Sequence, residues 1–567
     1  MKKIKFIVLP LLMVVFSVTS CSDEFLEVAP TGSLSSAELS SKAGLEGSLI
    51  AAYSMLLGRS GFYSDASNWF WGSVRGGEAN KGTNAGDQSQ VNEIQAYAAQ
   101  TNNASVFEKY RTCYEGVARA NATLKLLAVA QESVSEEVKS RIEAEAKFLR
   151  GHYYFELKKN FDDTPYVDET WDELTPVSNN VDLWTFIEAD LKHAYDNLPE
   201  TQSEIGRANK WAAGAYYGKA LLYQGKFAEA KTVLNDVVDS GTTPNGTPYG
   251  LNDDYATAFR STNDNSLESV FAAQAAAGTG NIQNANAGLV LNFPNGPGAP
   301  GGCCGFFQPS FELANSFRTD ANGLPLLDGS YNDAANKLVT DMGMEAADPF
   351  TVDAGNVDTR LDHSIGRRDI PYLDWGPHPG KTWIRDQPYA GPYAPKKFIY
   401  YQAGIGVEND GSSWTPGYTA VNYNIIRFAD VMLMAAEAEI ESNGDLGRAA
   451  GLIDDVRARA AGSLIAGSPA NYNVGLYGSF ASTADARAAV RFERKLELSG
   501  EGHRMYDLVR WGTAADELSN YLAIDGPQLN APFAGASFDA GTDEYLPIPQ
   551  DEIDLLGADI LIQNPGY

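Results

Sequence analysis

Two pairs of carboxylates are close enough in the sequence to act together in acid–base chemistry. They are Asp454 with Asp455 and Glu493 with Glu497. Hydrolysis of a glycosidic bond needs two carboxyl groups about 5 to 10 Å apart. The glutamate pair, however, alternates with three basic residues, Arg491, Arg494 and Lys495. Charges three or four residues apart on a helix usually form ion pairs, so we interpret these residues as structural.

The segment GHRMYDLVRWG carries a further charged group. Arg504, Asp507 and Arg510 have the spacing of an ion-pair ladder that fixes helix packing. No serine elbow, phosphate loop or cysteine nucleophile is visible. The histidines have no pair at zinc-ligand spacing: His152, His193, His363, His378 and His503. The sequence thus indicates no metal and no cofactor, and favours a binding protein over an enzyme.

The elements that position these residues are mainly helices. From about residue 40 to 235 the pattern is helical, as in RIEAEAKFLRGHYYFELKKNF, where apolar residues gather on one side. Residues 207–241 alternate small and large apolar side chains and turn at Gly225. Ala213 and Ala220 allow close helix approach, so the pattern predicts a tetratricopeptide-like antiparallel hairpin. A generic helical hairpin is the alternative.

The middle of the chain, from about 241 to 420, is rich in glycine, proline, asparagine and aromatic residues. This composition forbids long helices and favours ordered surface loops, where binding function tends to lie. Helical periodicity returns with NYNIIRFADVMLMAAEAEIES, whose apolar stripe is Phe428, Val431, Met432, Ala435 and Ala436. The expected fold class is mostly α, with helical hairpins as a scaffold and a large irregular region for binding.

The N-terminus resembles a bacterial lipoprotein signal. Lys2, Lys3 and Lys5 precede a run of about eleven apolar residues, too short to span a bilayer, which needs ~20. Residues 1–20 are the expected signal peptide and VTSC the expected lipobox, so Cys21 is the expected lipidation site. Ordinary signal cleavage is the alternative. The acidic SDEF that follows begins a polar tether over residues 21–40 and resembles a signal for display on the cell exterior.

The acidic balance limits the partners. The formal net charge of −30 becomes −33 once the three lysines of the signal are removed. Phosphates would be repelled by such a surface, so nucleic acid and anionic lipid head groups are poor partners. Neutral or cationic ligands remain open.

The stretch GGCCGFFQPSF places two of the four cysteines side by side. Cα atoms of neighbours are ~3.8 Å apart across a trans peptide, less than the ~4.4 to 6.8 Å usual for disulfides. The flanking glycines can supply unusual backbone angles, and an oxidising compartment would preserve the bond. We predict a Cys303–Cys304 disulfide; two packed free thiols are the alternative. Cys113, in a helical pattern, is expected to be a buried free cysteine.

Four blocks of the sequence together resemble one family. They are AEAKFLRGHYYFELKKNFDDTPYV; NIIRFADVMLMAAEAEIE with IDDVRARA; ERKLELSGEGHRMYDLVRWG; and YLPIPQDEI to QNPGY. With the lipobox, they span nearly the whole chain in the order of the SusD/RagB family of outer-membrane lipoproteins. The resemblance implies tetratricopeptide-like hairpins over 41–240, a loop-rich ligand-binding region over 241–420 and a C-terminal helical region over 421–567.

The resemblance also implies a function. Such proteins capture glycans, or sometimes other nutrients, at the cell surface and deliver them to a SusC-like TonB-dependent transporter. The expected partners are an oligosaccharide or polysaccharide, that transporter, and the outer membrane through the lipid on Cys21. The alternatives are a binder of a peptide or other nutrient with the same transporter and, less favoured, a surface glycoside hydrolase.

The first candidate ligand segment is NWFWGSVRGGEANKGTNAGDQ. Sugar rings pack on aromatic planes while their hydroxyls need a few polar groups. Alternation would direct Trp69 and Trp71 to the same side, opposite Phe70, if the segment is extended; core packing of at least one tryptophan is the alternative. The candidate polar residues are Glu78, Asn80, Lys81 and Asp87. Family members often carry an aspartate where this chain has Gly77-Glu78, so the chain departs from the family pattern at Glu78.

Two further segments complete the expected ligand face. The loop from 369 to 401 supplies Trp375, Trp383 and Arg385, with Tyr372, Tyr389 and Tyr393 nearby; packing beneath the loop or a transporter contact is the alternative. The predicted disulfide of Cys303 and Cys304 would form a rigid plate beside Phe306 and Phe307 at the same face. The alternative places both phenylalanines in the core.

Overall fold

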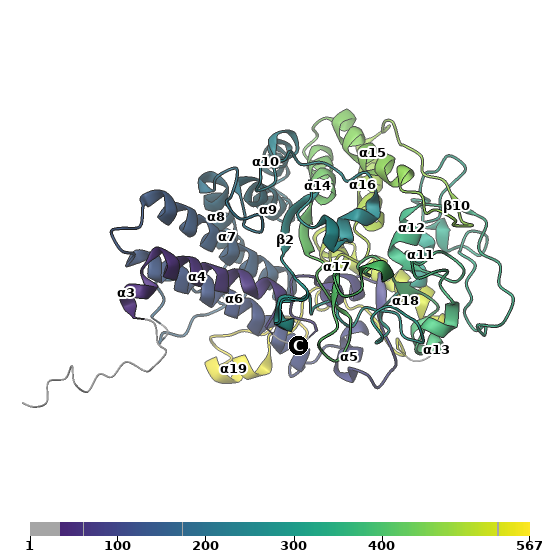
Figure 1. The fold of residues 1–567 in the computed structure, drawn as a ribbon, viewed down its shortest axis with the longest axis horizontal. Coiled ribbons are helices and arrows are strands. Elements are labelled where there is room, and N and C mark those ends of the chain that lie inside the picture. Colours follow the sequence, from purple (N-terminus) through teal and green to yellow (C-terminus); the bar gives the residue numbers. More distant parts are fainter. Residues whose placement is uncertain (1–34, 60–61, 173, 530–531) are drawn as a thin grey trace, which may run out of the picture.

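Long helices form both ends of the chain, and short elements form its middle (Figure 1). The computed structural model describes residues 35–59, 62–172, 174–529 and 532–567; the predicted signal peptide and Cys21 lie outside them. The N-terminal helices are α3 (Ser36–Leu39), α4 (Lys42–Tyr53), α5 (Asn92–Gln95), α6 (Ala104–Ala128), α7 (Glu136–Phe161), α8 (Leu183–Asn197), α9 (Lys210–Tyr223) and α10 (Phe227–Ser240). The prediction of a mostly α fold is confirmed.

Consecutive helices pack as antiparallel hairpins. Helix α9 turns into α10 at Gly225, whose φ of +70° lies in the left-handed region that favours glycine. A Cβ on Gly218 would lie 2.6 Å from Leu234 Cδ2, so the two helices approach as closely as a glycine allows. Helices α6 to α10 each contact the next. The predicted hairpin around Gly225 is therefore present.

The C-terminal helices continue this stack. They are α14 (Phe428–Glu441), α15 (Leu446–Gly462), α16 (Thr483–Glu497), α17 (Arg504–Arg510), α18 (Ala514–Asp525) and α19 (Gln550–Leu556). Helix α14 packs on α10 and also contacts α15 and α16. Every residue from 428 to 440 is buried, not only the predicted apolar stripe. The reason is that α14 contacts α9, α10, α15, α16 and strand β9 (Tyr423–Arg427), so several elements cover it.

Residues 241–420 contain no helix longer than six residues. Their short helices are α11 (Phe311–Ser316), α12 (Arg360–Ser364) and α13 (Gln387–Ala390). Four antiparallel strand pairs tie this region together and to its neighbours: β1 (Ala79–Gly82) with β3 (Phe306–Pro309), β2 (Ser269–Ala273) with β9 (Tyr423–Arg427), β5 (Ile365–Gly366) with β6 (Ala394–Pro395), and β7 (Asn409–Asp410) with β8 (Tyr418–Thr419). The parallel pair is β4 (Asn356–Val357) with β10 (Asn471–Tyr472).

Most of the charged residues considered for catalysis are buried in ion pairs. The exception is the first carboxylate pair, because Asp454 is half-buried and accepts from the backbone N–H groups of Tyr477 and Gly478, and Asp455 is exposed. Glu493 and Glu497 are both fully buried, and Arg360 contacts them at 2.6 and 3.0 Å. Asp507 accepts from Arg494 and from Arg510 of its own helix. Arg504 does not join this ladder but pairs with Glu517 at 3.1 Å. The structural, ion-paired role predicted for Glu493, Glu497, Asp507 and Arg510 is confirmed. Arg504 is also ion-paired, but with Glu517 and not with Asp507.

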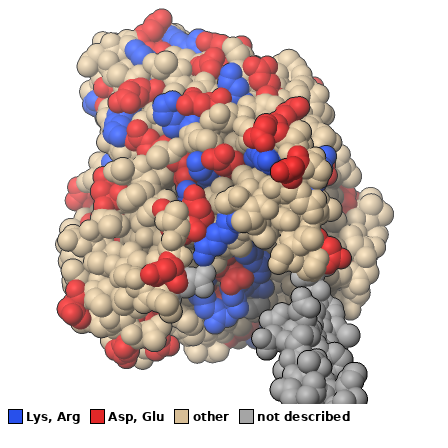
Figure 2. Space-filling model, turned by 90° about the vertical axis from the view of Figure 1, so that its left-hand side faces the viewer, with Lys and Arg blue, Asp and Glu red and all other residues tan. Residues whose placement is uncertain are grey.

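Charges on the helical face shown in Figure 2 are mixed. Acidic and basic side chains are interspersed there, and one group of Lys and Arg lies in the lower central part of the view. The net charge of −30 is thus not spread as one acidic surface on this face. Within the residues that the structure describes, no helix is long and apolar enough to cross a membrane.

Candidate functional site

The two predicted ligand tryptophans are buried. Trp69 and Trp71 are 1% and 0% exposed and lie in a π-helical turn, Trp69–Val74, not in an extended segment. Asn68, at φ +49°, begins this turn, so the side chains spread around it and the predicted alternation of Trp69 and Trp71 against Phe70 is wrong. The alternative of core packing applies to both rings.

These tryptophans instead hold the neighbouring loop. The indole N–H of Trp69 donates to the carbonyl of Phe62 at 2.9 Å, and that of Trp71 donates to the carbonyl of Tyr63. The N–H is the only hydrogen-bonding group of an indole, and a buried N–H needs an acceptor. The tryptophans therefore fix the backbone that carries Phe62.

The predicted polar residues of this segment are also turned inward. Glu78, Asn80 and Lys81 are at most 2% exposed. Burial raises the pKa of Glu78 to about 7 even though it accepts a bond from the Gly500 N–H at 3.1 Å. Asn80 donates to the Ala390 carbonyl, and Lys81 donates to two backbone carbonyls of its own loop. Burial also lowers the pKa of Lys81 to about 8. In this conformation the three side chains are bonded within the protein.

Asp87 and Arg385 remain accessible. They form an ion pair at 2.5 Å with side chains 30% and 36% exposed, although they are far apart in the sequence. Arg385 also donates to Thr83 Oγ1 at 2.7 Å, and the Thr83 N–H donates to the carbonyl of Gly305. The structure thus brings two residues predicted from separate segments together beside the cysteine loop.

Cys303 and Cys304 form the predicted disulfide. Their peptide bond is cis, so the Cα atoms are 3.2 Å apart, closer than the trans spacing assumed from sequence. Cys304 is buried and Cys303 is half-buried, with its Sγ 3.7 Å from Thr415 Oγ1. The two phenylalanines that follow differ in burial. Phe306 is fully buried, whereas Phe307 is half-buried and meets Trp69 edge to face.

The aromatic residues of the loop from 369 to 401 mostly pack beneath it. Trp383 is 5% exposed, donates its indole N–H to the Pro297 carbonyl and contacts Tyr372 edge to face. Trp375 is half-buried and donates to the Tyr400 carbonyl at 3.0 Å. Both indoles fix the loop backbone in this structure, as expected from the alternative in which these rings pack beneath the loop.

Three rings that sequence reasoning did not select form a partly exposed surface, here called the aromatic platform. They are Trp414, which is exposed, and Phe62 and Tyr418, which are half-buried. Trp414 is 56% exposed, and its ring centroid lies 6.2 Å from Phe62 and 6.3 Å from Tyr418. Its indole N–H donates to the Tyr418 hydroxyl at 3.1 Å. Trp414 occupies the tip of the β7–β8 hairpin. Its sequence signal, GSSWTPGY, is a tryptophan among turn residues.

The cysteine loop supports this platform. Thr415, next to Trp414, donates to the Gly301 carbonyl at 2.6 Å and lies against Cys303. Gly302 approaches Pro416, whose ring atoms would lie 3.6 Å from an added Cβ. The disulfide loop therefore lies between the Asp87–Arg385 pair on one side and the platform on the other.

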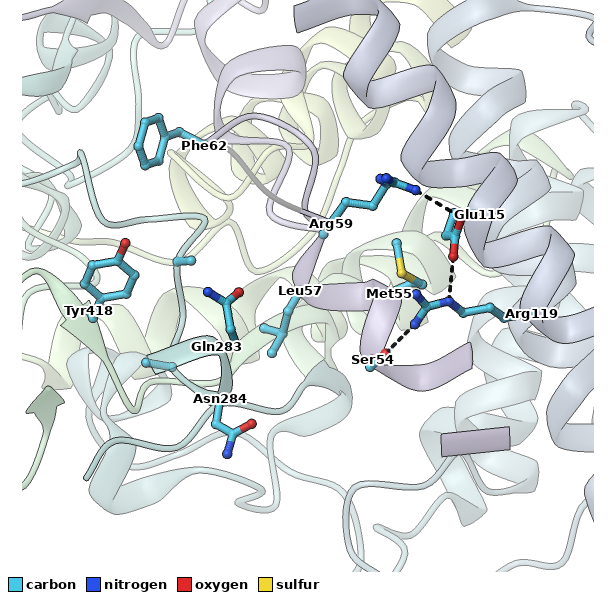
Figure 3. A pocket seen from close by; sticks show the side chains of 13 residues that line it. Ser54, Met55, Leu57, Arg59, Phe62, Glu115, Arg119, Gln283, Asn284 and Tyr418 are labelled. Atoms are coloured by element: carbon cyan, nitrogen blue, oxygen red, sulfur yellow. Dashed lines mark hydrogen bonds and ion pairs between the residues drawn. The ribbon is translucent and has the colours of Figure 1, made fainter. Parts of the chain in front are cut away.

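A polar pocket of about 560 Å³ adjoins the platform, sharing Phe62 and Tyr418 with it (Figure 3). Glu115 lies between Arg59 and Arg119, at 3.0 and 2.9 Å. Arg119 also donates to Ser54 Oγ at 3.0 Å. The exposed amides Gln283 and Asn284 line another wall. Guanidinium, carboxylate and amide groups beside aromatic rings are suited to a ligand with both apolar faces and many hydroxyls.

The pocket chemistry does not resemble a hydrolytic site. Among the lining residues the only carboxylate is Glu115, which is held by two arginines. Glycoside hydrolysis normally uses two carboxyl groups. Across the described part of the chain, no group of three or more His, Cys, Asp or Glu side chains could hold a metal ion.

Two family models match the chain. The model described as "SusD family" matches residues 267–567, and the one described as "Starch-binding associating with outer membrane" matches residues 24–222. A SusD-like protein, P2, of Formosa agariphila is 25% identical over 581 aligned residues that cover 100% of this chain and 99% of that protein.

Solved structures share the fold. A laminarin-binding SusD-like protein is 26% identical with a TM-score of 0.65, covering 93% of this chain and 99% of its own. Surface glycan-binding protein A of Bacteroides thetaiotaomicron, solved with laminarihexaose, is 21% identical with a TM-score of 0.64, covering 92% of this chain and 99% of its own.

Proposed function

Because the chain belongs to the SusD family, we propose that it is a non-catalytic glycan-binding lipoprotein that delivers oligosaccharide or polysaccharide to a SusC-like TonB-dependent transporter. The two family matches, to residues 24–222 and 267–567, support this proposal across most of the chain.

The observation that carries the proposal is the aromatic platform beside the polar pocket. Trp414 is 56% exposed although burial would remove a large apolar area from water. A pyranose ring would stack on Trp414 while its hydroxyls reach the groups around Glu115 and Arg119. The Asp87–Arg385 pair, across the cysteine loop, offers a second set of hydroxyl partners.

Laminarin is the first glycan to test. The relative named for laminarin binding is 26% identical over 93% of this chain. A glycan array on the chain without residues 1–21 would survey laminarin together with other neutral and acidic polysaccharides. Binding of any glycan supports the proposal, and the array identifies which one. Binding of peptides, with no glycan retained, would favour the alternative of a non-glycan nutrient.

The non-catalytic role rests on the lone carboxylate of the pocket. Incubating the protein with the bound glycan should release no reducing ends over hours, whereas a glycosidase would release them steadily. A positive result would contradict this part of the proposal and leave glycan binding intact.

The outer-membrane anchor and the transporter are separate parts of the proposal. Cys21→Ala should shift the protein from the membrane fraction to the soluble extracytoplasmic fraction, because the lipid would be lost. Affinity purification from intact cells should recover a TonB-dependent transporter with the wild-type protein. Recovery of Cys21→Ala in the membrane fraction at the wild-type level would contradict the anchor.

A further inference from the structure

A second and larger pocket lies between the loop 327–333 and helices α16, α17 and α18. Its volume is about 720 Å³, and it shares no lining residue with the first pocket. Ligand pockets commonly have volumes of about 300 to 1,000 Å³. In Figure 1, α16, α17 and α18 lie to the right of α6, whose Glu115 and Arg119 line the first pocket. The second pocket is therefore a separate place on the molecule.

Aromatic rings line this pocket and are held in place. Phe492 and Trp511 are half-buried, and Tyr331 meets Phe492 edge to face at 5.7 Å. The Trp511 indole N–H donates to Glu437 at 2.7 Å, and the guanidinium carbons of Arg491 and Arg510 each lie 4.9 Å from its ring centroid. Fixed, partly exposed rings offer stacking surfaces at little entropic cost.

The polar groups of the pocket are also fixed before any ligand arrives. Lys495 Nζ contacts Glu312 Oε1 at 2.6 Å, and the Tyr331 hydroxyl donates to the same oxygen at 2.7 Å. At another wall Arg504 pairs with Glu517 at 3.1 Å. Donors and acceptors that are already oriented favour binding of a ligand with several hydroxyls.

Arg491 has unused hydrogen-bonding capacity. Its guanidinium makes no hydrogen bond to any other described residue, and its nearest carboxylate oxygen, on Glu441, is 3.8 Å away. The side chain is 27% exposed and lines the pocket. An acceptor on a ligand would therefore gain a charged donor that makes no hydrogen bond within the described residues and whose contacts are the Trp511 ring and the ion pair with Glu441.

The charge of the lining selects between ligand classes. Its cations are Arg491, Lys495 and Arg504, and its acids are Glu312, Asp328, Asp333 and Glu517. One excess negative charge, in a chain of net charge −30, disfavours an acidic saccharide. We infer that this pocket is a second carbohydrate site, which takes a neutral saccharide against Trp511 and Phe492 with its hydroxyls on Arg491. The inference rests on the proposed function.

The test fills the second pocket without touching its ion pairs. Ala488 is exposed on α16 and lines the pocket, so Ala488→Trp should block it. Ala484, one turn earlier on the same helix, is exposed but does not line the pocket, and Ala484→Trp is the matched control. Arg491→Ala, which removes one donor, should weaken the second site about tenfold.

Calorimetric titration with laminarihexaose, or with another neutral hexasaccharide that the array selects, counts the sites. We expect two sites in the wild type and in Ala484→Trp, and one in Ala488→Trp. Trp414→Ala should weaken the first site and leave the second unchanged, and the double variant should keep only the weakened first site. One wild-type site that Ala488→Trp leaves unchanged would overturn the second site while the proposed function stands. Wild-type protein that binds no saccharide would overturn both. If Ala488→Trp loses all binding and Trp414→Ala binds like wild type, the second site is kept and the first site is rejected.

Discussion

Two aromatic segments of similar composition have opposite roles in this molecule. The segment NWFWGSV, residues 68–74, buries Trp69 and Trp71 almost completely, whereas GSSWTPGY, residues 411–418, leaves Trp414 56% exposed. The first segment forms a π-helical turn inside the core, and the second is the tip of a short hairpin. Both contribute to one surface, because the buried indoles hold the backbone of Phe62, which meets Trp414. Tryptophans near a ligand face can therefore support it without touching the ligand.

The largest expected effect sharpens this contrast through stability. Trp71→Ala should lower the free energy of unfolding by about 3 to 5 kcal/mol, because it leaves a large cavity and an unpaired carbonyl on Tyr63. Chemical denaturation with fluorescence or circular dichroism measures the change. Trp414→Ala is the control and should change stability by no more than about 0.5 kcal/mol. If the two variants lost equal free energy of unfolding, the distinction between the buried, supporting Trp71 and the exposed Trp414 would be wrong.

The next effect concerns the buried carboxyl that follows the first segment. Burial raises the pKa of Glu78 to about 7, above the unfolded value of about 4.3. The stability that this group contributes is therefore complete below about pH 4 and is lost as the pH rises through 7. Glu78→Gln should raise the free energy of unfolding at pH 8 by on the order of 2 kcal/mol and change it little at pH 4. A variant less stable than wild type at pH 8 would show that the carboxylate is stabilised there.

A smaller effect is expected at the polar pocket beside the platform. Arg119→Ala removes a donor held by Glu115 and Ser54, and should weaken glycan binding about tenfold. Arg111, whose side chain is 44% exposed on the same helix and outside the pocket, supplies the control Arg111→Ala. Equal affinities of the two variants by calorimetry would place the ligand away from Arg119.

The smallest effect tests the cysteine loop. In denatured, unreduced protein lacking Cys21, thiol titration should find one free cysteine, Cys113, which is buried in the native structure. Three thiols would contradict the disulfide. Cys303→Ser with Cys304→Ser should weaken glycan binding only a few-fold, roughly 0.5 to 1 kcal/mol, because the loop supports the platform through Thr415 and need not stack on the sugar.

Regular elements could be predicted from the sequence because their signals are local. Apolar periodicity and the turn at Gly225 identify the hairpin of α9 and α10, and alternating charges identify the ion-paired face of α16. The paired cysteines between glycines likewise indicated their disulfide.

The exposure of individual aromatic residues could not be predicted, because distant contacts decide it. Trp383 is buried by residues such as Tyr372 and by the carbonyl of Pro297. The sequence around Trp383 does not indicate these contacts. The pairing of Asp87 with Arg385, across nearly 300 residues, depends on the β1–β3 register beside the cysteine loop. Trp414 was missed because one tryptophan among turn residues is a weaker pattern than a cluster.

The most direct test of the account compares the two kinds of tryptophan in one binding measurement. Wild type, Trp414→Ala and Trp383→Phe, which keeps a buried ring, would each be titrated by calorimetry with the glycan that the array selects. If the sugar stacks on Trp414, Trp414→Ala should lose about 1 to 3 kcal/mol of affinity at its site, comparable to other aromatic stacking, and Trp383→Phe should bind like wild type. Unchanged affinity in Trp414→Ala with a loss in Trp383→Phe would contradict the account.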